Sequence, residues 1–129
     1  MSKLDVNLQQ FRKGIERLRE SLAMEKSDLV RDSAILRFEI TMDLSWKLLK
    51  TFMEERLGVV CFSPKGCFRE AFRQNLISYD EEWLDYVDMR NQTAHTYNED
   101  FANELYARLP QVLKKLESLL DSIQTQQSI

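Results

Sequence analysis

The feature that most constrains the fold is a long helical segment that is apolar on two sides. Between residues 28 and 57, apolar side chains recur at steps of three and four and form two stripes. The first stripe comprises Ile35, Phe38, Met42, Trp46, Leu49 and Met53, and the second comprises Ile40, Leu44 and Leu48. At about 100° per residue, Ile35 and Ile40 lie about 140° apart around the axis. We therefore expect this helix to run through the middle of a bundle, or to turn its second face to another subunit.

Two shorter segments flank this helix and carry their own helical signals. Residues 4–24 show one apolar stripe, made of Leu8, Phe11, Ile15, Leu18 and Leu22. Gly58 follows the long helix in the position that commonly ends one. After a short extended connector, Ser63 and Pro64 are typical of an N-cap and a first helical residue, which predicts a short helix over about residues 64–75.

Two further helices are predicted in the second half of the chain. Ser78-Tyr79-Asp80-Glu81 has the spacing of a capping box, and the helix after it carries Trp83, Leu84 and Val87. Thr96 and Glu99 have the same spacing before a long last helix, in which we expect Pro110 to cause a bend without ending the helix. The stripe of that helix is Phe101, Leu105, Leu109, Val112, Leu116, Leu119 and Ile123. We predict an all-α, antiparallel up-and-down bundle of four main helices plus one short helix, as a single domain over residues 1–129.

The composition excludes some classes of protein. The net charge is −3, with positive and negative residues interspersed along the chain. Strong attraction of the whole surface to nucleic acid is therefore not predicted, although the net charge does not exclude a local basic cleft. The N-terminus lacks the apolar core of a signal peptide, and no apolar run approaches the roughly 18 residues that span a bilayer. We expect a soluble, cytoplasmic protein that does not bind a membrane.

The two cysteines, Cys61 and Cys67, are separated by five residues and have no histidine nearby. This spacing is poor for zinc, so no metal site is predicted, and nothing in the sequence calls for a cofactor. A disulfide is sterically conceivable, but the cytosol is reducing. We expect two ordinary buried or half-buried thiols.

The stretch DMRNQTAHTYNED, residues 88–100, holds the only histidine, His95. On an unbroken helix Arg90 and His95 would point about 140° apart, while Asn91 and His95 would share a face. A helix that ends or loosens near Thr93 would bring the three side chains to one end of the bundle. That convergence is a testable requirement for a site.

An imidazole and a guanidinium together suit cleavage of a phosphodiester bond. An imidazole exchanges protons near neutral pH, and a guanidinium grips phosphate oxygens with two parallel bonds. RNA carries its own nucleophile, the 2′-hydroxyl, so no metal is required. The reaction needs two proton transfers and each chain has one histidine, whereas a homodimer would supply two histidines. The plainer alternative is that Arg90 and His95 only satisfy the last carbonyls of a helix and its dipole.

At these residues the chain resembles the HEPN superfamily, small helical bundles whose hallmark is R-x(4–6)-H. The closer similarity is to the branch paired with minimal nucleotidyltransferases, called nucleotidyltransferase substrate-binding proteins. It covers RFEITMDLSWKLLK at 37–50, SPKGCFREAF at 63–72 and EEWLDYVDMRNQTAHTYNED at 81–100. The resemblance implies a bundle that forms a homodimer, with the motifs of both chains facing one cleft.

The resemblance also implies two competing functions. In the first, the chain is a toxin that cleaves RNA: Arg90 holds the phosphate, His95 transfers protons, and Asn91 supports the site in a positioning role. A nucleotidyltransferase antitoxin then silences it by transferring AMP to Tyr97. In the second, the chain is a non-catalytic subunit that binds a nucleotide or substrate for a nucleotidyltransferase. For Tyr97 the structural alternative is a half-buried ring packed on the last helix.

Four more residues could contact RNA or a nucleotide. Lys65, Arg69 and Arg73 fall on one face of the short helix and could form a basic rim, although a solvated face is the commoner explanation. Trp83 could stack under a base. It also lies on an apolar stripe, where a place in the core is the commoner outcome.

Overall fold

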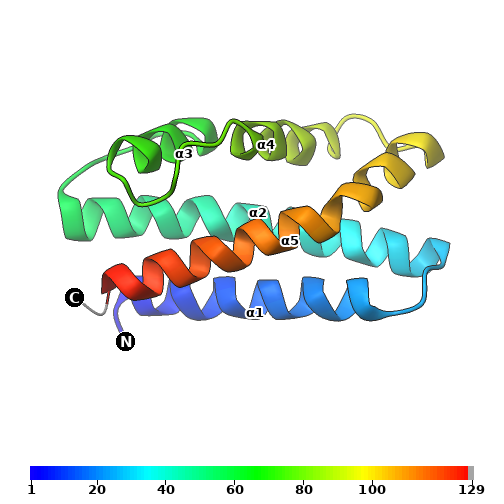
Figure 1. Ribbon diagram of the computed structural model, residues 1–129, viewed down its shortest axis with the longest axis horizontal. Coiled ribbons are helices and arrows are strands. Elements are labelled where there is room, and N and C mark those ends of the chain that lie inside the picture. The colour runs from blue at the N-terminus through cyan, green and yellow to red at the C-terminus, as the bar shows by residue number, and fades with distance from the viewer. Residues whose placement is uncertain (128–129) are drawn as a thin grey trace.

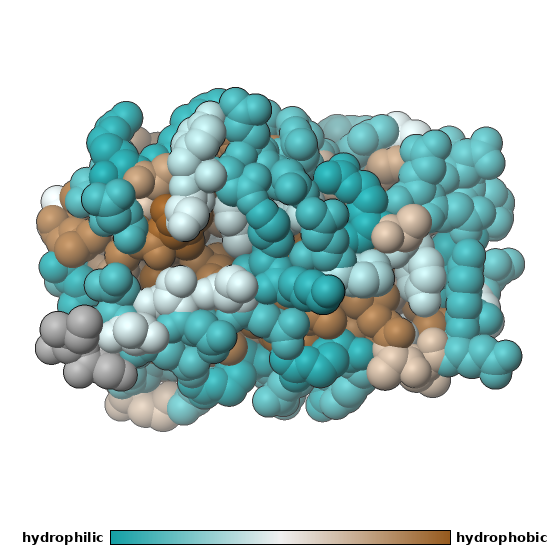
Figure 2. All heavy atoms as spheres, viewed as in Figure 1, coloured by the Kyte–Doolittle hydropathy of each residue, from teal (hydrophilic) through white to brown (hydrophobic). Residues whose placement is uncertain are grey.

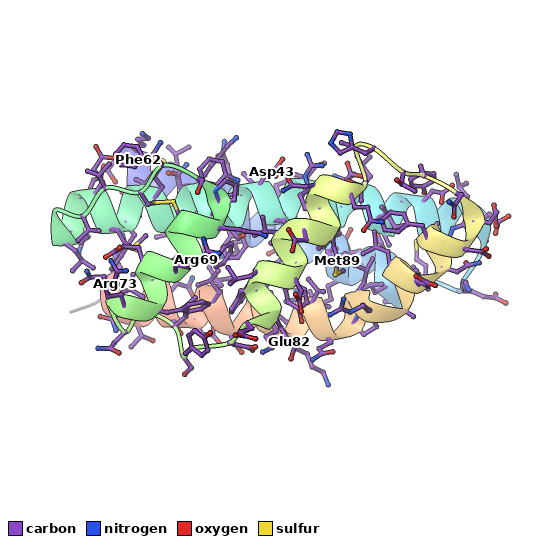
Figure 3. The ribbon with its side chains drawn as sticks, turned by 90° about the horizontal axis from the view of Figure 1, so that it is seen from above. Asp43, Phe62, Arg69, Arg73, Glu82 and Met89 are labelled. Carbon is purple, nitrogen blue, oxygen red and sulfur yellow. A yellow bond between two sulfur atoms is a disulfide. The ribbon has the colours of Figure 1, made fainter. Side chains whose placement is uncertain are left out.

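The computed structural model describes residues 1–127 and is built from α-helices without a strand in that range. The helices are α1 (Lys3–Ala23), α2 (Asp28–Phe52), α3 (Pro64–Arg73), α4 (Glu82–Gln92) and α5 (Glu99–Gln127), and a π-helical turn, η1 (Met53–Leu57), continues α2. Figure 1 shows α1 and α2 antiparallel and α5 returning beside α1. Figure 3 shows α3 and α4 side by side and antiparallel, both crossing over α2, and Lys65 at the start of α3 pairs with Asp88 near the end of α4. The expected all-α bundle is confirmed, with α3 and α4 as two short helices that pack against α2 and against each other.

The long helix α2 occupies the middle of the bundle, as its two apolar sides predict. It packs against α1, α3, α4 and α5. Phe38, Met42 and Leu49 of the first stripe are buried. The second stripe is covered only in part, because Leu48 is buried whereas Ile40 is 39% exposed. Part of the second face therefore remains at the surface.

Two of the predicted helix ends are confirmed and two are wrong. Gly58 ends the η1 turn with a left-handed φ of 66°, and Ser63 caps α3 by accepting from the Gly66 amide. Ser78 does not cap α4: the N-cap residue is Glu81, and the Glu82 amide donates to the Asp80 carboxylate at 3.0 Å. The side chain of Asn98, instead of Thr96, accepts from the Phe101 amide at 2.9 Å.

The last of these differences has a physical reason. A capping box at Thr96 requires the Glu99 carboxylate to turn back toward the N-terminus. In the folded chain Glu99 instead accepts two hydrogen bonds from Arg31. The helix α5 also begins at Glu99, and it continues through Pro110 as predicted.

The expectation of two free thiols is wrong. Cys61 and Cys67 form a disulfide, and their Cα atoms lie 5.1 Å apart. The chain reverses at the Ser63 cap, which brings the connector over the first turns of α3, and both cysteines are buried there. Local spacing alone did not reveal that geometry, because it depends on the turn between the connector and the helix.

The face seen in Figure 2 is mainly hydrophilic, with apolar residues at the end where α2 passes into its connector. Among the described residues, no helix combines the length and the apolar character needed to cross a membrane. Large apolar side chains are exposed in two main places. On α2 they form an exposed apolar stripe of Leu29, Leu36 and Ile40, and around the connector they are Leu57, Val60 and Phe62.

Candidate functional site

The helix α4 ends where the proposed site requires it to end. Its last residue is Gln92 and Thr93 is the C-cap. The chain then turns tightly, with the amides of His95 and Thr96 both donating to the Gln92 carbonyl, at 3.0 and 2.9 Å. The predicted break near Thr93 is confirmed. Arg90 and Asn91 lie on the last turn of the helix and His95 lies in the turn that follows.

Arg90 is held by a carboxylate of the central helix. Its Nε and Nη2 donate to Asp43 at 3.1 and 3.0 Å, Nη1 donates to the Thr93 hydroxyl at 3.2 Å, and a carboxylate oxygen of Glu39 lies 3.9 Å from Nη1. The hydrogen bonds to Asp43 raise the pKa of Arg90 above its ordinary value. Figure 3 shows Asp43 beside the last turns of α4.

The number of N–H groups that Arg90 has left for a ligand follows from these bonds. A guanidinium has five N–H groups, and three of those of Arg90 are used in these bonds, which leaves two without a hydrogen-bond partner among the described residues. The side chain is 27% exposed. A phosphate oxygen can therefore be bound without first displacing Asp43.

Asn91 and His95 are both exposed. Asn91 shares a small cleft with Arg90, Asp43 and Pro64. Within residues 1–127 no hydrogen bond joins the side chains of Arg90, Asn91 and His95 to one another. The fold thus brings the three groups to the same end of α4 and leaves Asn91 and His95 open to solvent.

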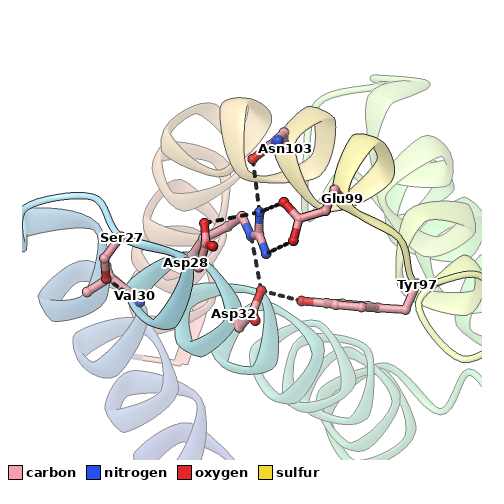
Figure 4. Close-up of polar contacts among 8 residues, drawn as sticks. Ser27, Asp28, Val30, Asp32, Tyr97, Glu99 and Asn103 are labelled. Atoms are coloured by element: carbon pink, nitrogen blue, oxygen red, sulfur yellow. Dashed lines mark hydrogen bonds and ion pairs between the residues drawn. The ribbon is translucent and has the colours of Figure 1, made fainter.

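Tyr97 forms a second polar network next to this turn (Figure 4). Its hydroxyl donates to Asp32 Oδ1 at 2.6 Å, and the same oxygen accepts from Arg31 Nε at 3.0 Å. Loss of water around the hydroxyl, the bond to Asp32 and the charge of that carboxylate raise the pKa of Tyr97 to about 12. The residue is nevertheless 52% exposed, so a partner can reach it.

Arg31 is the buried centre of this network. Its side chain is 3% exposed. It donates to both carboxylate oxygens of Glu99, at 3.0 and 3.4 Å, and to Asn103 at 3.2 Å, in addition to its bond with Asp32. These bonds join the first turns of α2 to the first turns of α5. The bond to Glu99, followed by that to Asp32, raises the pKa of Arg31 above its ordinary value.

Sequence reasoning missed an acidic row on α2 formed by Asp32, Glu39 and Asp43. These residues are seven and four positions apart, which places them on one helix face. Glu39 lies between the other two, since it approaches Arg90 and its charge contributes to the raised pKa of Tyr97. The spacing of the three carboxylates was the available signal.

The residues expected to form a basic rim on α3 differ in their surroundings. Lys65 pairs with Asp88 of α4 at 2.7 Å, and Arg73 pairs with Glu70 at 2.9 Å while remaining 74% exposed. Arg69 is also exposed, and Figure 3 shows it on α3 with Arg73.

Trp83 has a different environment from the one that base stacking requires. It is 4% exposed, and its ring stacks on Phe68 with 4.9 Å between centroids. Tyr86 covers it edge-on at 5.7 Å. The expectation that Trp83 could stack under a base is corrected, because both its burial and its ring partners assign it to the core.

Comparison with known proteins gives a consistent result. Residues 3–125 match the family model described as "Nucleotidyltransferase substrate binding protein like". A protein of Haemophilus influenzae named "Probable ribonuclease HepT" is 32% identical over 100 residues, which cover 74% of this chain and 68% of that protein.

Solved structures share the fold. A crystal structure of a Thermus thermophilus protein has 38% identity and a TM-score of 0.81, covering 88% of this chain and 98% of its own. The tri-AMPylated Shewanella oneidensis HEPN toxin, solved in complex with an MNT antitoxin, has 17% identity and a TM-score of 0.79, covering 97% of this chain and 99% of its own. At that identity the likeness concerns the fold alone.

Proposed function

Because the chain belongs to the nucleotidyltransferase substrate binding protein like family of HEPN bundles, we propose that it is the toxin of a toxin–antitoxin pair. Its activity is metal-independent cleavage of RNA, silenced by a minimal nucleotidyltransferase partner. The observation that carries this proposal is the state of Arg90. It is fixed by Asp43, keeps two N–H groups for a phosphate and lies next to the turn that presents His95.

The proposed roles follow from the chemistry of each group. The 2′-hydroxyl of RNA attacks the neighbouring phosphorus, and the bond to the 5′-oxygen breaks. His95 transfers a proton in this reaction, Arg90 stabilises the negative charge that builds on the phosphate, and Asn91 positions the ribose or phosphate. The ion pair with Asp43 keeps the guanidinium in one orientation, so that little ordering remains when RNA binds.

A second copy of the chain completes the site in this proposal. Leu36 of the exposed apolar stripe and Glu39 of the acidic row are three residues apart, so they lie about 60° apart around α2. A two-fold contact through the stripe would bring the Arg90 and His95 of both copies toward one seam. Leu36→Glu should yield monomers in light scattering and lose RNA cleavage. Normal cleavage by a monomer would remove the dimer from the proposal.

AMP transfer to Tyr97 is the proposed means of silencing. Tyr97 is two residues after His95, and Glu39 lies near both its hydroxyl and Arg90. An adenylate there adds bulk and negative charge where the RNA phosphate must bind. The Shewanella oneidensis toxin of this fold, which is tri-AMPylated, is a precedent for such a modification. Lys65, Arg69 and Arg73 would guide RNA along α3.

The test is expression in cells without the nucleotidyltransferase. Wild type should arrest growth and cleave cellular RNA, whereas Arg90→Ala and His95→Ala should do neither at equal protein levels. Gln92→Ala is the matched control, because Gln92 is an exposed neighbour on the last turn of α4. Equal growth of wild type and His95→Ala would overturn the toxin function. Intact-mass analysis after co-expression with the partner should then place AMP on Tyr97 and on no residue of Tyr97→Phe.

The family description favours a second candidate function. A chain described as substrate binding for a nucleotidyltransferase could present a nucleotide or other substrate without cleaving anything. The same groups would serve, with Arg90 on a phosphate. Nucleotide binding that depends on Arg90 but not on His95, together with normal growth of cells expressing wild type, would favour this function.

A further inference from the structure

The hydroxyl of Tyr97 already has a proton acceptor in its own chain. It donates to Asp32, a residue 65 positions earlier in the sequence, over 2.6 Å. Such a short bond to a carboxylate is a charge-assisted hydrogen bond. The tyrosine also remains half exposed. The hydroxyl therefore has a protein partner on one side and is accessible to an incoming group.

Asp32 is held in place by groups that are themselves fixed. Its Oδ1 accepts from Arg31 Nε, and Arg31 is buried and bonded to Glu99 and Asn103 of α5 (Figure 4). Asp32 can thus keep its orientation toward Tyr97 while a partner protein docks. The side chain of Asp32 is 46% exposed, so a proton placed on it can pass to water.

We propose that Asp32 is the base that accepts the Tyr97 proton during AMP transfer, an inference that rests on the proposed function. In this step the Tyr97 oxygen forms a bond to the α-phosphorus of ATP bound to the nucleotidyltransferase. The bond between that phosphorus and the oxygen bridging to the β-phosphorus breaks. Pyrophosphate leaves with the electron pair, and the phenolic proton moves to Oδ1 of Asp32 and from there to water.

The chemistry of the phenol explains the need for a base. With a pKa raised to about 12, Tyr97 is almost wholly protonated near neutral pH and is a poor nucleophile. Asp32 is ionised there, because its bonds with Tyr97 and Arg31 lower its pKa. The charged groups acting on the hydroxyl are Asp32, Arg31 and Glu39. Of these, Asp32 alone is hydrogen-bonded to it among the described residues.

The competing explanation is that Asp32 only supports the fold. Asp28→Asn is the matched control for this, since Asp28 is a carboxylate of the same helix that lies 3.7 Å from Arg31, whereas the Tyr97 hydroxyl donates to Asp32. Asp32→Asn keeps the size and an oxygen acceptor but cannot take a proton. Asp32→Glu keeps the carboxylate and the charge.

The experiment uses ATP labelled at the α-phosphate and measures the rate at which the nucleotidyltransferase transfers AMP to the purified chain. The chain is present at a saturating concentration, and the rate is measured as a function of pH. Asp28→Asn should match wild type. Asp32→Asn should be slower by about 100-fold or more near neutral pH, the usual size of the loss when a general base is removed. Its rate, relative to wild type, should rise about tenfold per pH unit as hydroxide replaces the carboxylate. Asp32→Glu should share the wild-type pH profile at a lower rate.

The outcomes separate this inference from the proposed function. If wild type takes no AMP on Tyr97, the proposed silencing fails. If wild type is modified and Asp32→Asn is modified at the same rate with the same pH profile, Asp32 is not the base. If Asp32→Asn and Asp32→Glu are slowed equally with the wild-type profile, Asp32 only positions Tyr97, and the inference is again overturned. Thermal unfolding of each variant shows whether it still folds. If Asp32→Asn does not fold, the pH profile of Asp32→Glu compared with that of wild type decides.

Discussion

Arg31 and Arg90 both bind carboxylates of α2, yet they differ in what they leave available. Arg31 is 3% exposed and uses four of its five N–H groups, on Asp32, Glu99 and Asn103. Arg90 is 27% exposed and uses three. The first joins two long helices, and the second lies at the open end of a short one. Spare donors and access to solvent distinguish Arg90, the arginine proposed to bind phosphate, from the structural Arg31, because both have carboxylate partners.

The largest expected effect is on activity, when Arg90 is replaced by Met. We expect RNA cleavage to fall about 100-fold or more, because the charge that stabilises the transition state is lost. Thermal unfolding should change little, since Asp43 and Glu39 keep contact with water. Initial cleavage rates and circular dichroism melts measure the two effects. Arg37→Met is the control, because Arg37 lies on α2 in the groove toward α1. A loss of activity that only follows a loss of folded protein would contradict the assignment.

The next effect is on stability, when Arg31 is replaced by Met. The Tm should fall by several degrees, because Glu99 and Asn103 lose the donor that ties α5 to α2. Cleavage per folded molecule should stay near that of wild type. Calorimetry together with cleavage rates checks both points. An unchanged Tm would show that the buried network contributes little to stability.

A smaller effect is expected when Asp43 is replaced by Asn. The amide can accept only one of the two bonds from Arg90, so the guanidinium is less well oriented but still present. Cleavage should fall a few-fold, far less than in Arg90→Met. Rates of the two variants at equal RNA concentration provide the measurement. If Asp43→Asn were as inactive as Arg90→Met, Asp43 would have a role beyond holding Arg90.

The smallest effect is a pH dependence that belongs to the Arg31 network. The bond from Arg31 lowers the pKa of Glu99 below its ordinary 4.5, and the bonds from Tyr97 and then Arg31 lower that of Asp32 below 3.8. The stabilisation is therefore complete above the unfolded values and is lost as the pH falls through the folded ones. Urea midpoints should fall more steeply below about pH 4.5 in wild type than in Arg31→Met. Parallel curves would contradict this.

Much of the fold was predictable from local patterns. The two apolar sides of residues 28–57 identified the central helix, and the Ser63 cap and the glycine at 58 marked real helix ends. The break after Gln92 was predicted from what Arg90 and His95 would require. These features depend on neighbouring residues in the sequence.

The parts that were not predicted depend on contacts between distant segments. Arg31 resembles a solvated residue at the start of a helix until Glu99 and Asn103, 68 and 72 residues later, enclose it. The same contact removes Glu99 from the expected capping box. The position of Trp83 in the sequence is compatible with a place in the core and with a role in stacking on a base. The ring of Phe68, which stacks on it, shows that Trp83 belongs to the core.

The most direct test of the central claim is RNA cleavage by the purified chain, freed of its nucleotidyltransferase and of AMP, in the presence of EDTA. Wild type and Gln92→Ala should cleave an unstructured RNA and leave a cyclic phosphate on the 3′ end, while His95→Ala and Arg90→Met should leave it intact. Cleavage by His95→Ala at the wild-type rate, or none by the unmodified wild type, would contradict the account.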